Sequence, residues 1–220
     1  VGGQFVFMKT QGRCVDNMAL LDPAAMKAAL GENPKTVYGD QGKCPSTRMG
    51  AAALLRRTLT EAVQYRKDKE RGRLDREDFD IEPWMPVLQK AIPLKVHAHR
   101  ADDILTAIRI AKEFNIDITI DHGTEAHLVV DEVKKSGFPV IVGTDLTSRS
   151  KLEVQNMSFK TNKILAEAGV LIAVTTDHPV ALIQYLPLCA GLAVKEGLPM
   201  EEGLKAITIN PAKICRVEQR

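Results

Sequence analysis

Four of the five histidines in the chain, and one aspartate beside them, stand directly after apolar, β-forming segments. They are His97, His99, His122, His178 and Asp177. Neutral imidazoles combined with a carboxylate are a common ligand set for zinc. A single buried histidine is more often a hydrogen-bonded core residue than a ligand, but several histidines at neighbouring strand ends favour a metal site. The fifth histidine, His127, falls inside a predicted helix and is not expected to bind metal.

The segments that must position these side chains alternate between strand and helix. Predicted strands cover residues 94–96, 116–120, 139–142 and 170–175. Predicted helices cover residues 102 or 103 to 114, 124–135, 160–168, 183–196 and 200–209. This alternation indicates successive βαβ units and a parallel sheet. The carboxyl ends of parallel strands share one face, and in a (β/α)₈ barrel that face holds the active site.

The first third of the chain has a less regular pattern. Residues 5–8 predict a short strand, and residues 26–30 fit a strand or one helical turn equally well. Residues 31–34 predict a turn because Pro34 disfavours a helical Asn33. Ser46 is the expected N-cap of a helix that Gly72 ends, and a second helix is predicted at residues 83–91. Four or five clear strands fall short of the eight that a closed barrel needs. We therefore predict an α/β fold, a (β/α)₈ TIM barrel seen as an incomplete barrel.

Composition excludes several classes of partner. The net charge is only +2, from 30 basic and 28 acidic residues, which gives no reason to expect nucleic acid or a membrane surface. The four cysteines form no Cys-x-x-Cys motif, and scattered thiols fit a reducing compartment, so the cytoplasm is the default location. The expected partner is a small-molecule substrate, and the sequence is also compatible with a homo-oligomer.

Three strand-end segments together resemble the amidohydrolase superfamily of metal-dependent hydrolases. They are Val96-His97-Ala98-His99, Ile120-Asp121-His122-Gly123-Thr124 and Thr175-Thr176-Asp177-His178-Pro179, which resemble the fifth, sixth and eighth strand ends of that barrel. The branch related to imidazolonepropionase is the most similar one, and the segment 208–213 also resembles it. The resemblance implies hydrolysis of a C–N bond in a non-peptide amide or cyclic amide, with a metal-activated water.

The resemblance also implies roles for individual residues. His97 and His122 would be metal ligands, and Asp177 would bind metal and act as the general base. A divalent metal lowers the pKa of water, and a nearby carboxylate can take its proton and pass it to a leaving nitrogen. Zinc is the first expectation for the metal, with iron and manganese as alternatives.

The remaining candidate site residues each allow more than one interpretation. His99 lies two residues after His97 and would face the same side of a strand, so it is assigned to substrate binding or to support of the metal ligands. Arg100 and His178 are further candidates for substrate contact, although His178 also fits a helix-entry position. Glu32 is a candidate acidic metal ligand from an earlier strand, or an exposed turn carboxylate.

One departure from the family pattern concerns the start of the chain. The family's first strand carries a His-x-His pair, whereas the only such pair here is His97 and His99. Because the chain begins with Val-Gly-Gly and ends at Arg220, we expect residues 1–220 to be a partial barrel, without the N-terminal strands and the small β-sandwich. The alternative functions are a catalytically inactive amidohydrolase-like barrel that binds a small ligand, and a metal-dependent aldolase or lyase.

Overall fold

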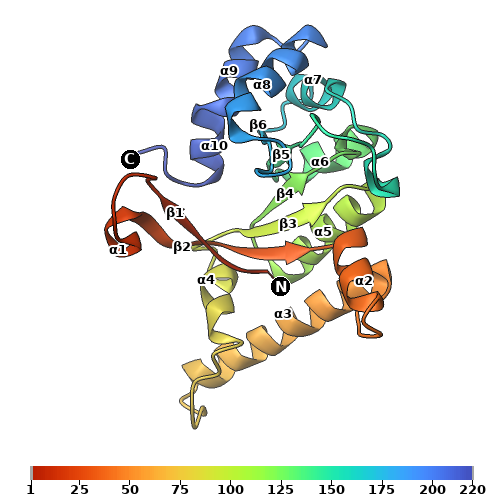
Figure 1. The fold of residues 1–220 in the computed structure, drawn as a ribbon. Helices are drawn as coiled ribbons and strands as arrows, with labels where there is room; N and C mark the ends of the chain where they lie inside the picture. The colour runs from red at the N-terminus through yellow and green to blue at the C-terminus, as the bar shows by residue number, and fades with distance from the viewer. Residues whose placement is uncertain (1, 220) are drawn as a thin grey trace. The chain divides into compact units, whose positions relative to one another are not determined.

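The computed structural model describes residues 2–219, so Val1 and Arg220 lie outside the described residues. The chain divides into two compact units, one of residues 2–95 with 110–118 and one of residues 96–109 with 119–219. Figure 1 labels the elements of both. Among residues 2–219, no helix combines the length and the apolar character that crossing a membrane requires.

The first unit contains a long antiparallel hairpin. Strand β1 (Gly3–Met8) pairs with β2 (Ala19–Ala29), with Gly3 opposite Lys27 and Phe5 opposite Ala25, and α1 (Val15–Met18) lies between them. The predicted strand at residues 5–8 is therefore confirmed. Residues 26–30 fitted a strand or a helical turn from the sequence, and the structure shows that 26–29 belong to β2. Met26 also donates its N–H to Pro93 O, just before β3.

Two helices of the first unit begin at places that the sequence predicted incorrectly. Residues 31–34 are not a simple turn, because α2 (Glu32–Gly39) starts at Glu32. Pro34 is tolerated there since the first-turn N–H groups have no partner within the helix. The long helix α3 (Arg48–Glu70) is capped by Thr47 instead of Ser46, and Thr47 Oγ1 accepts a hydrogen bond from Gly50 N at 2.9 Å. The predicted helix at residues 83–91 is a 3₁₀ turn, η1 (Glu82–Trp84), followed by α4 (Met85–Leu88).

The second unit carries the βαβ units that the sequence predicted. Its strands are the end of β3 (Leu94–Ala98), then β4 (Ile118–His122), β5 (Val140–Val142) and β6 (Ile172–Val174). Strands β4, β5 and β6 are parallel, with His122 opposite Val142 and Val142 opposite Val174. Gly123 N donates to Ala98 O, which joins the ends of β3 and β4. The carboxyl ends of these strands therefore meet at one edge, as predicted, in an α/β arrangement; closure into a barrel stays a prediction.

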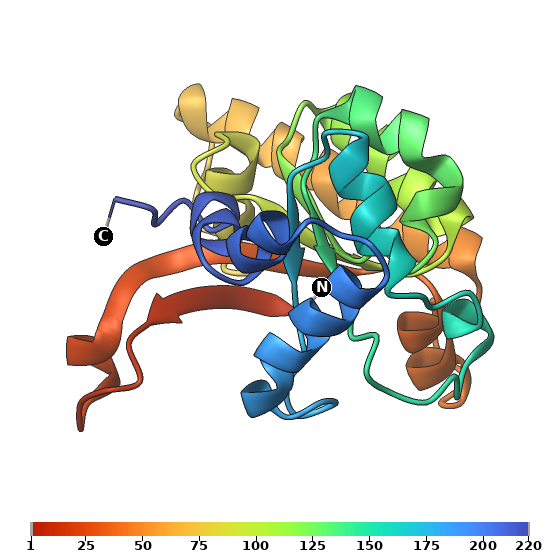
Figure 2. The same ribbon diagram turned by 90° about the horizontal axis from the view of Figure 1, so that it is seen from above.

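Helices cover these strands and bury their apolar side chains. Figure 2 shows α6 (Val130–Ser136) and α7 (Lys160–Glu167) gathered on one side of β4 to β6. The remaining elements are α5 (Ala101–Phe114), η2 (Ala126–Val129), η3 (Leu152–Val154), η4 (Ile183–Tyr185), α8 (Leu186–Lys195), α9 (Met200–Ile207) and α10 (Ile209–Ile214). The strand residues Ile120, Val140 and Ile172 are at most 1% exposed, so the strand ends stand on a close-packed core.

Candidate metal centre

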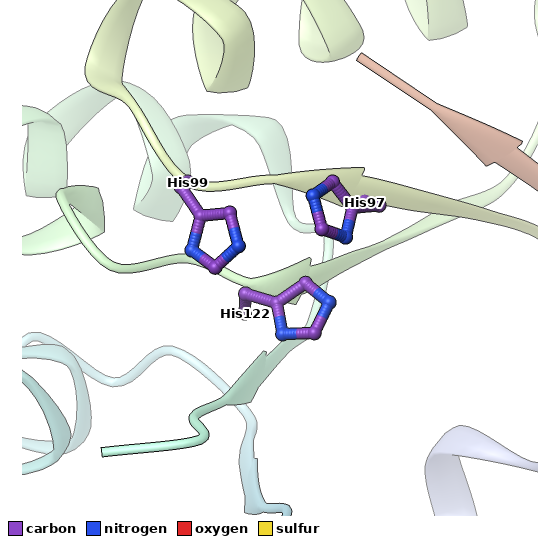
Figure 3. A group of neighbouring side chains, drawn as sticks. All are labelled: His97, His99 and His122. Carbon is purple, nitrogen blue, oxygen red and sulfur yellow. The ribbon is translucent and has the colours of Figure 1, made fainter. Parts of the chain in front are cut away.

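Three histidines of the second unit form one buried cluster, the histidine triad of His97, His99 and His122 (Figure 3). His97 lies in β3, His99 directly follows that strand, and His122 is the last residue of β4. Their ring centroids are 4.7 Å (His97–His99), 4.4 Å (His97–His122) and 4.6 Å (His99–His122) apart. One ring nitrogen from each lies within 4.8 Å of the others. Residues that are 25 positions apart thus converge because two parallel strands end side by side.

His122 is held by its backbone and by a hydrogen bond. Its φ of 77° lies in the left-handed region, which is costly for a residue other than glycine and concentrates at functional sites. Its Nδ1 lies 2.6 Å from Gly143 O. Because a carbonyl oxygen can only accept, Nδ1 carries the hydrogen, and the neutral ring therefore has its lone pair on Nε2. This arrangement is typical of metal-binding histidines.

The glycine after His122 is required by the close packing of the neighbouring strand. Gly123 has a φ of 53°, and a Cβ atom placed on it would lie 2.5 Å from Val140 Cγ1.

His99 is oriented by a different group, since its Nδ1 lies 2.7 Å from the hydroxyl of Thr124. Both histidines are thus fixed through Nδ1 by partners that follow β4 or β5.

Burial keeps the cluster in the neutral form that metal binding requires. The three side chains belong to residues that are only 6–8% exposed. Burial, reinforced by repulsion from His122 and His97, lowers the pKa of His99 to about 3. Burial and repulsion from His97 lower the pKa of His122 to about 4. These two imidazoles are therefore uncharged at neutral pH, with lone pairs that a cation can share.

A buried glutamate lies next to the triad, and no sequence pattern indicates it. Glu153, on η3, is 0% exposed, and its Oε1 lies 3.9 Å from His97 Nε2. It comes from the segment between β5 and α7, which has neither strand nor helix periodicity. No pattern in that segment distinguishes a buried carboxylate from an exposed one, so only the fold reveals it.

The predicted catalytic aspartate lies at the matching strand end. Asp177 follows β6, has a φ of 50° and is exposed, and its N–H donates to Thr175 Oγ1 at 3.1 Å. Its charge acts on His122 and raises the pKa of that histidine, against the larger effect of burial. The side chain is not among the closely grouped ligand atoms of the triad. Its assignment as metal ligand and general base stays a prediction, as does the substrate role of the exposed His178.

The other predicted site residues have partners of their own. Arg100 follows β3 and forms an ion pair with Asp102, with 3.0 Å between Nε and Oδ1. Glu32 is the first residue of α2 in the first unit and lies 3.9 Å from Arg48. The substrate role of Arg100 and the metal role of Glu32 stay predictions. His127, not expected to bind metal, lies 3.0 Å from the Thr161 hydroxyl.

The side chains of the triad fit a divalent cation. Around a four-coordinate zinc ion with bonds of about 2.0–2.1 Å, ligand atoms lie roughly 3.3 Å apart. The triad offers one ring nitrogen from each histidine, all within 4.8 Å of one another, as a group that could hold one ion. Buried neutral imidazoles with a carboxylate at their edge suit zinc, iron or manganese better than magnesium or calcium, which prefer oxygen ligands.

Comparisons with known proteins agree with this chemistry. No family model matches the chain. A crystal structure described as an amidohydrolase from Thermotoga maritima superposes with a TM-score of 0.95 and 42% identity, over 98% of this chain and 58% of that one. A protein named amidohydrolase tasK from Hapsidospora irregularis is 26% identical over an alignment 214 residues long, which covers 89% of this chain and 22% of that protein. The chain therefore spans well under two thirds of each relative.

Proposed function

We propose that the chain is part of an amidohydrolase-superfamily protein, as its similarity to two proteins named amidohydrolase supports, and that it forms the metal-binding part of a hydrolase that cleaves a C–N bond in a non-peptide amide or cyclic amide. The observation that carries the proposal is the triad, in which three buried imidazoles from two strand ends converge within 4.8 Å. Burying polar groups is costly unless they are paired. Packing of a hydrophobic core alone therefore does not explain why three imidazoles converge.

In this proposal His97 and His122 would hold the metal ion, and His99 would be a third nitrogen donor beside them. A divalent cation, zinc in the first instance, supplies Lewis acidity that polarises the scissile carbonyl and lowers the pKa of the attacking water. The hydrogen bond from His122 Nδ1 to Gly143 O leaves the lone pair of the ring on Nε2, where a metal ion would bind. The hydrogen bond between His99 Nδ1 and the Thr124 hydroxyl holds the His99 ring in place.

Proton transfer is assigned to Asp177. Its carboxylate stands at the strand end next to β5 and acts electrostatically on His122. In the proposed reaction it accepts the proton from the attacking water and delivers it to the leaving nitrogen. Arg100 and His178 are proposed to contact the substrate from the loops after β3 and β6. Strand closure into a (β/α)₈ barrel belongs to the same proposal.

The test is hydrolysis of a panel of linear and cyclic amides by the purified protein, before and after removal of metal with a chelator. We expect turnover that is lost on chelation and restored by zinc, manganese or iron. His122→Asn keeps an N–H donor for Gly143 O but lacks Nε2, so it should stay folded and inactive. His127→Gln, outside the triad, is the matched control and should keep wild-type turnover. Metal binding without turnover of any amide would favour the ligand-binding alternative.

A further inference from the structure

Glu125 holds the backbone on both sides of the turn that follows β3. It is a half-buried residue three positions after His122, in the loop between β4 and η2. Its backbone N–H donates to His99 O at 2.8 Å, and its side-chain Oε2 accepts from Ala101 N at 2.8 Å. Ala101 is the first residue of α5, where the N–H groups have no partner within the helix and a carboxylate is a favoured acceptor. The segment 99–101 is therefore fixed at both ends by one residue of the neighbouring loop.

The other carboxylate oxygen of Glu125 contacts the loop between β5 and α7. Asn156 Nδ2 donates to Glu125 Oε1 at 2.8 Å. Arg149 holds the turn that carries Asn156, because it donates through Nε to Gln155 O at 3.0 Å and through Nη2 to Met157 O at 2.8 Å. Glu125 thus connects the loops that follow the consecutive strands β3, β4 and β5.

Two adjacent residues hold His99 in different ways. The Thr124 hydroxyl lies 2.7 Å from Nδ1 of the ring, whereas Glu125 holds the backbone from which the ring extends. A contact at Nδ1 alone leaves the ring free to move if its backbone shifts. Binding sites require their groups to be held within roughly 0.5 Å of the productive geometry. The backbone contacts of Glu125 therefore help to determine where the other nitrogen of the His99 ring lies.

We propose that Glu125 is a positioning residue of the metal centre, which places His99 for metal binding by holding His99 O and Ala101 N and tying them to the loop after β5. The inference rests on the proposed function, since it requires that the triad binds metal with His99 as a donor. In this proposal Glu125 touches neither the metal nor the substrate. Its effect on metal binding must therefore pass through His99.

The experiment measures zinc affinity by competition with a chromophoric chelator, with circular dichroism to establish that each variant is folded. We expect Glu125→Ala to weaken zinc binding by about 10-fold or more, since loss of groups behind the ligands costs about 10- to 100-fold. Glu125→Gln keeps an acceptor for Ala101 N, and the amide of Asn156 can turn to accept from the new NH₂ group, so its loss should be smaller. Glu132→Ala removes an exposed carboxylate from α6 and should bind zinc like the wild type.

A second background separates positioning from a general effect on the fold. In His99→Asn the ring that Glu125 positions is absent, so adding Glu125→Ala should cost no further zinc affinity. Damage to the fold would instead weaken zinc binding by the same factor in both backgrounds, because His97 and His122 remain in each. If His99→Asn binds no zinc, the cobalt-loaded Glu125→Ala protein decides. Shifted visible absorption bands at full loading support a displaced ligand, and wild-type bands contradict it.

The outcomes separate this inference from the proposed function. No zinc binding by the wild type would overturn both. Wild-type affinity in His99→Asn or in Glu125→Ala, with binding lost in His122→Asn, would overturn only the role of Glu125. Equal losses in Glu125→Ala and Glu125→Gln, or equal losses from Glu125→Ala in both backgrounds, would do the same. If Glu125→Ala does not fold, Glu125→Asp, which withdraws the carboxylate by one methylene, takes its place in each comparison.

Discussion

Acid should destabilise the metal-free protein through two buried histidines. Burial lowers the pKa of His99 to about 3 and that of His122 to about 4. In the unfolded chain a histidine titrates near a pKa of about 6.5. Below that pH these two histidines bind protons in the unfolded chain but stay neutral in the folded chain. The contribution to stability is therefore complete above about pH 6.5 and is lost as the pH falls towards 4.

The size of the effect follows from the pKa values. A pH of 5.0 is about 1.5 units below the pKa of about 6.5 that each histidine has in the unfolded chain. At roughly 1.4 kcal/mol per unit, each histidine therefore lowers the free energy of unfolding by about 2 kcal/mol. His99 and His122 together should therefore lower the free energy of unfolding by about 4 kcal/mol between pH 7.5 and pH 5.0.

Urea unfolding with a chelator present, followed by circular dichroism at pH 7.5, 6.0 and 5.0, measures this loss. Carboxyl groups titrate over part of the same range, so the informative quantity is the difference between variants. His122→Asn should lose about 2 kcal/mol less than the wild type between the two extreme pH values. His127→Gln removes a histidine outside the triad and should lose as much as the wild type. Equal losses in the wild type and His122→Asn would refute the reasoning.

Four further predictions concern single residues. Burial raises the pKa of Asp145 to about 7, so the folded state loses stability as the pH rises from about 4 to 7. Asp145→Asn should therefore stabilise the protein by roughly 2–4 kcal/mol at pH 8 and have little effect near pH 3, as measured by urea unfolding. Gly143→Ala should lower the free energy of unfolding by about 2–4 kcal/mol, because φ is +119° and the new Cβ would lie 2.5 Å from the carbonyl oxygen of residue 175; Gly191→Ala, in open space within α8, is the control and should be neutral or slightly stabilising. His99→Asn should weaken zinc binding measured by chelator competition if it is a ligand, whereas unchanged binding with a raised KM would return it to the substrate role. Asp177→Asn should lower kcat by about 100-fold or more with zinc content retained, and wild-type turnover in this variant would remove Asp177 from the mechanism.

The strand ends were predictable because parallel strands impose a simple rule. Apolar segments such as 116–120 and 170–175 identify buried strands, and the residues after them must share one edge. The convergence of His97 with His122 follows from that rule. The inclusion of His99 in the same cluster also follows, since residues two apart on a strand share a face.

Features that depend on packing across the fold were not predictable. Glu153 lies in a segment without periodicity, and nothing in the local sequence predicts that it is 0% exposed. Thr47 and Ser46 are both good N-cap residues, so the sequence could not choose between them. The segment 200–209 has one helical period, but the chain breaks at Thr208, with φ −129° and ψ −91°, and continues as α10. Such boundaries depend on contacts that local propensity does not contain.

Metal binding by the triad is tested by the metal content of the purified protein, measured by elemental analysis after zinc loading and dialysis against metal-free buffer. We predict at least one equivalent of zinc, manganese or iron per chain in the wild type and in His127→Gln. In His122→Asn the metal should be lost while circular dichroism shows that the fold is retained. A wild-type protein that retains no divalent metal after loading, or a His122→Asn variant that retains all of it, would contradict a metal site at the triad.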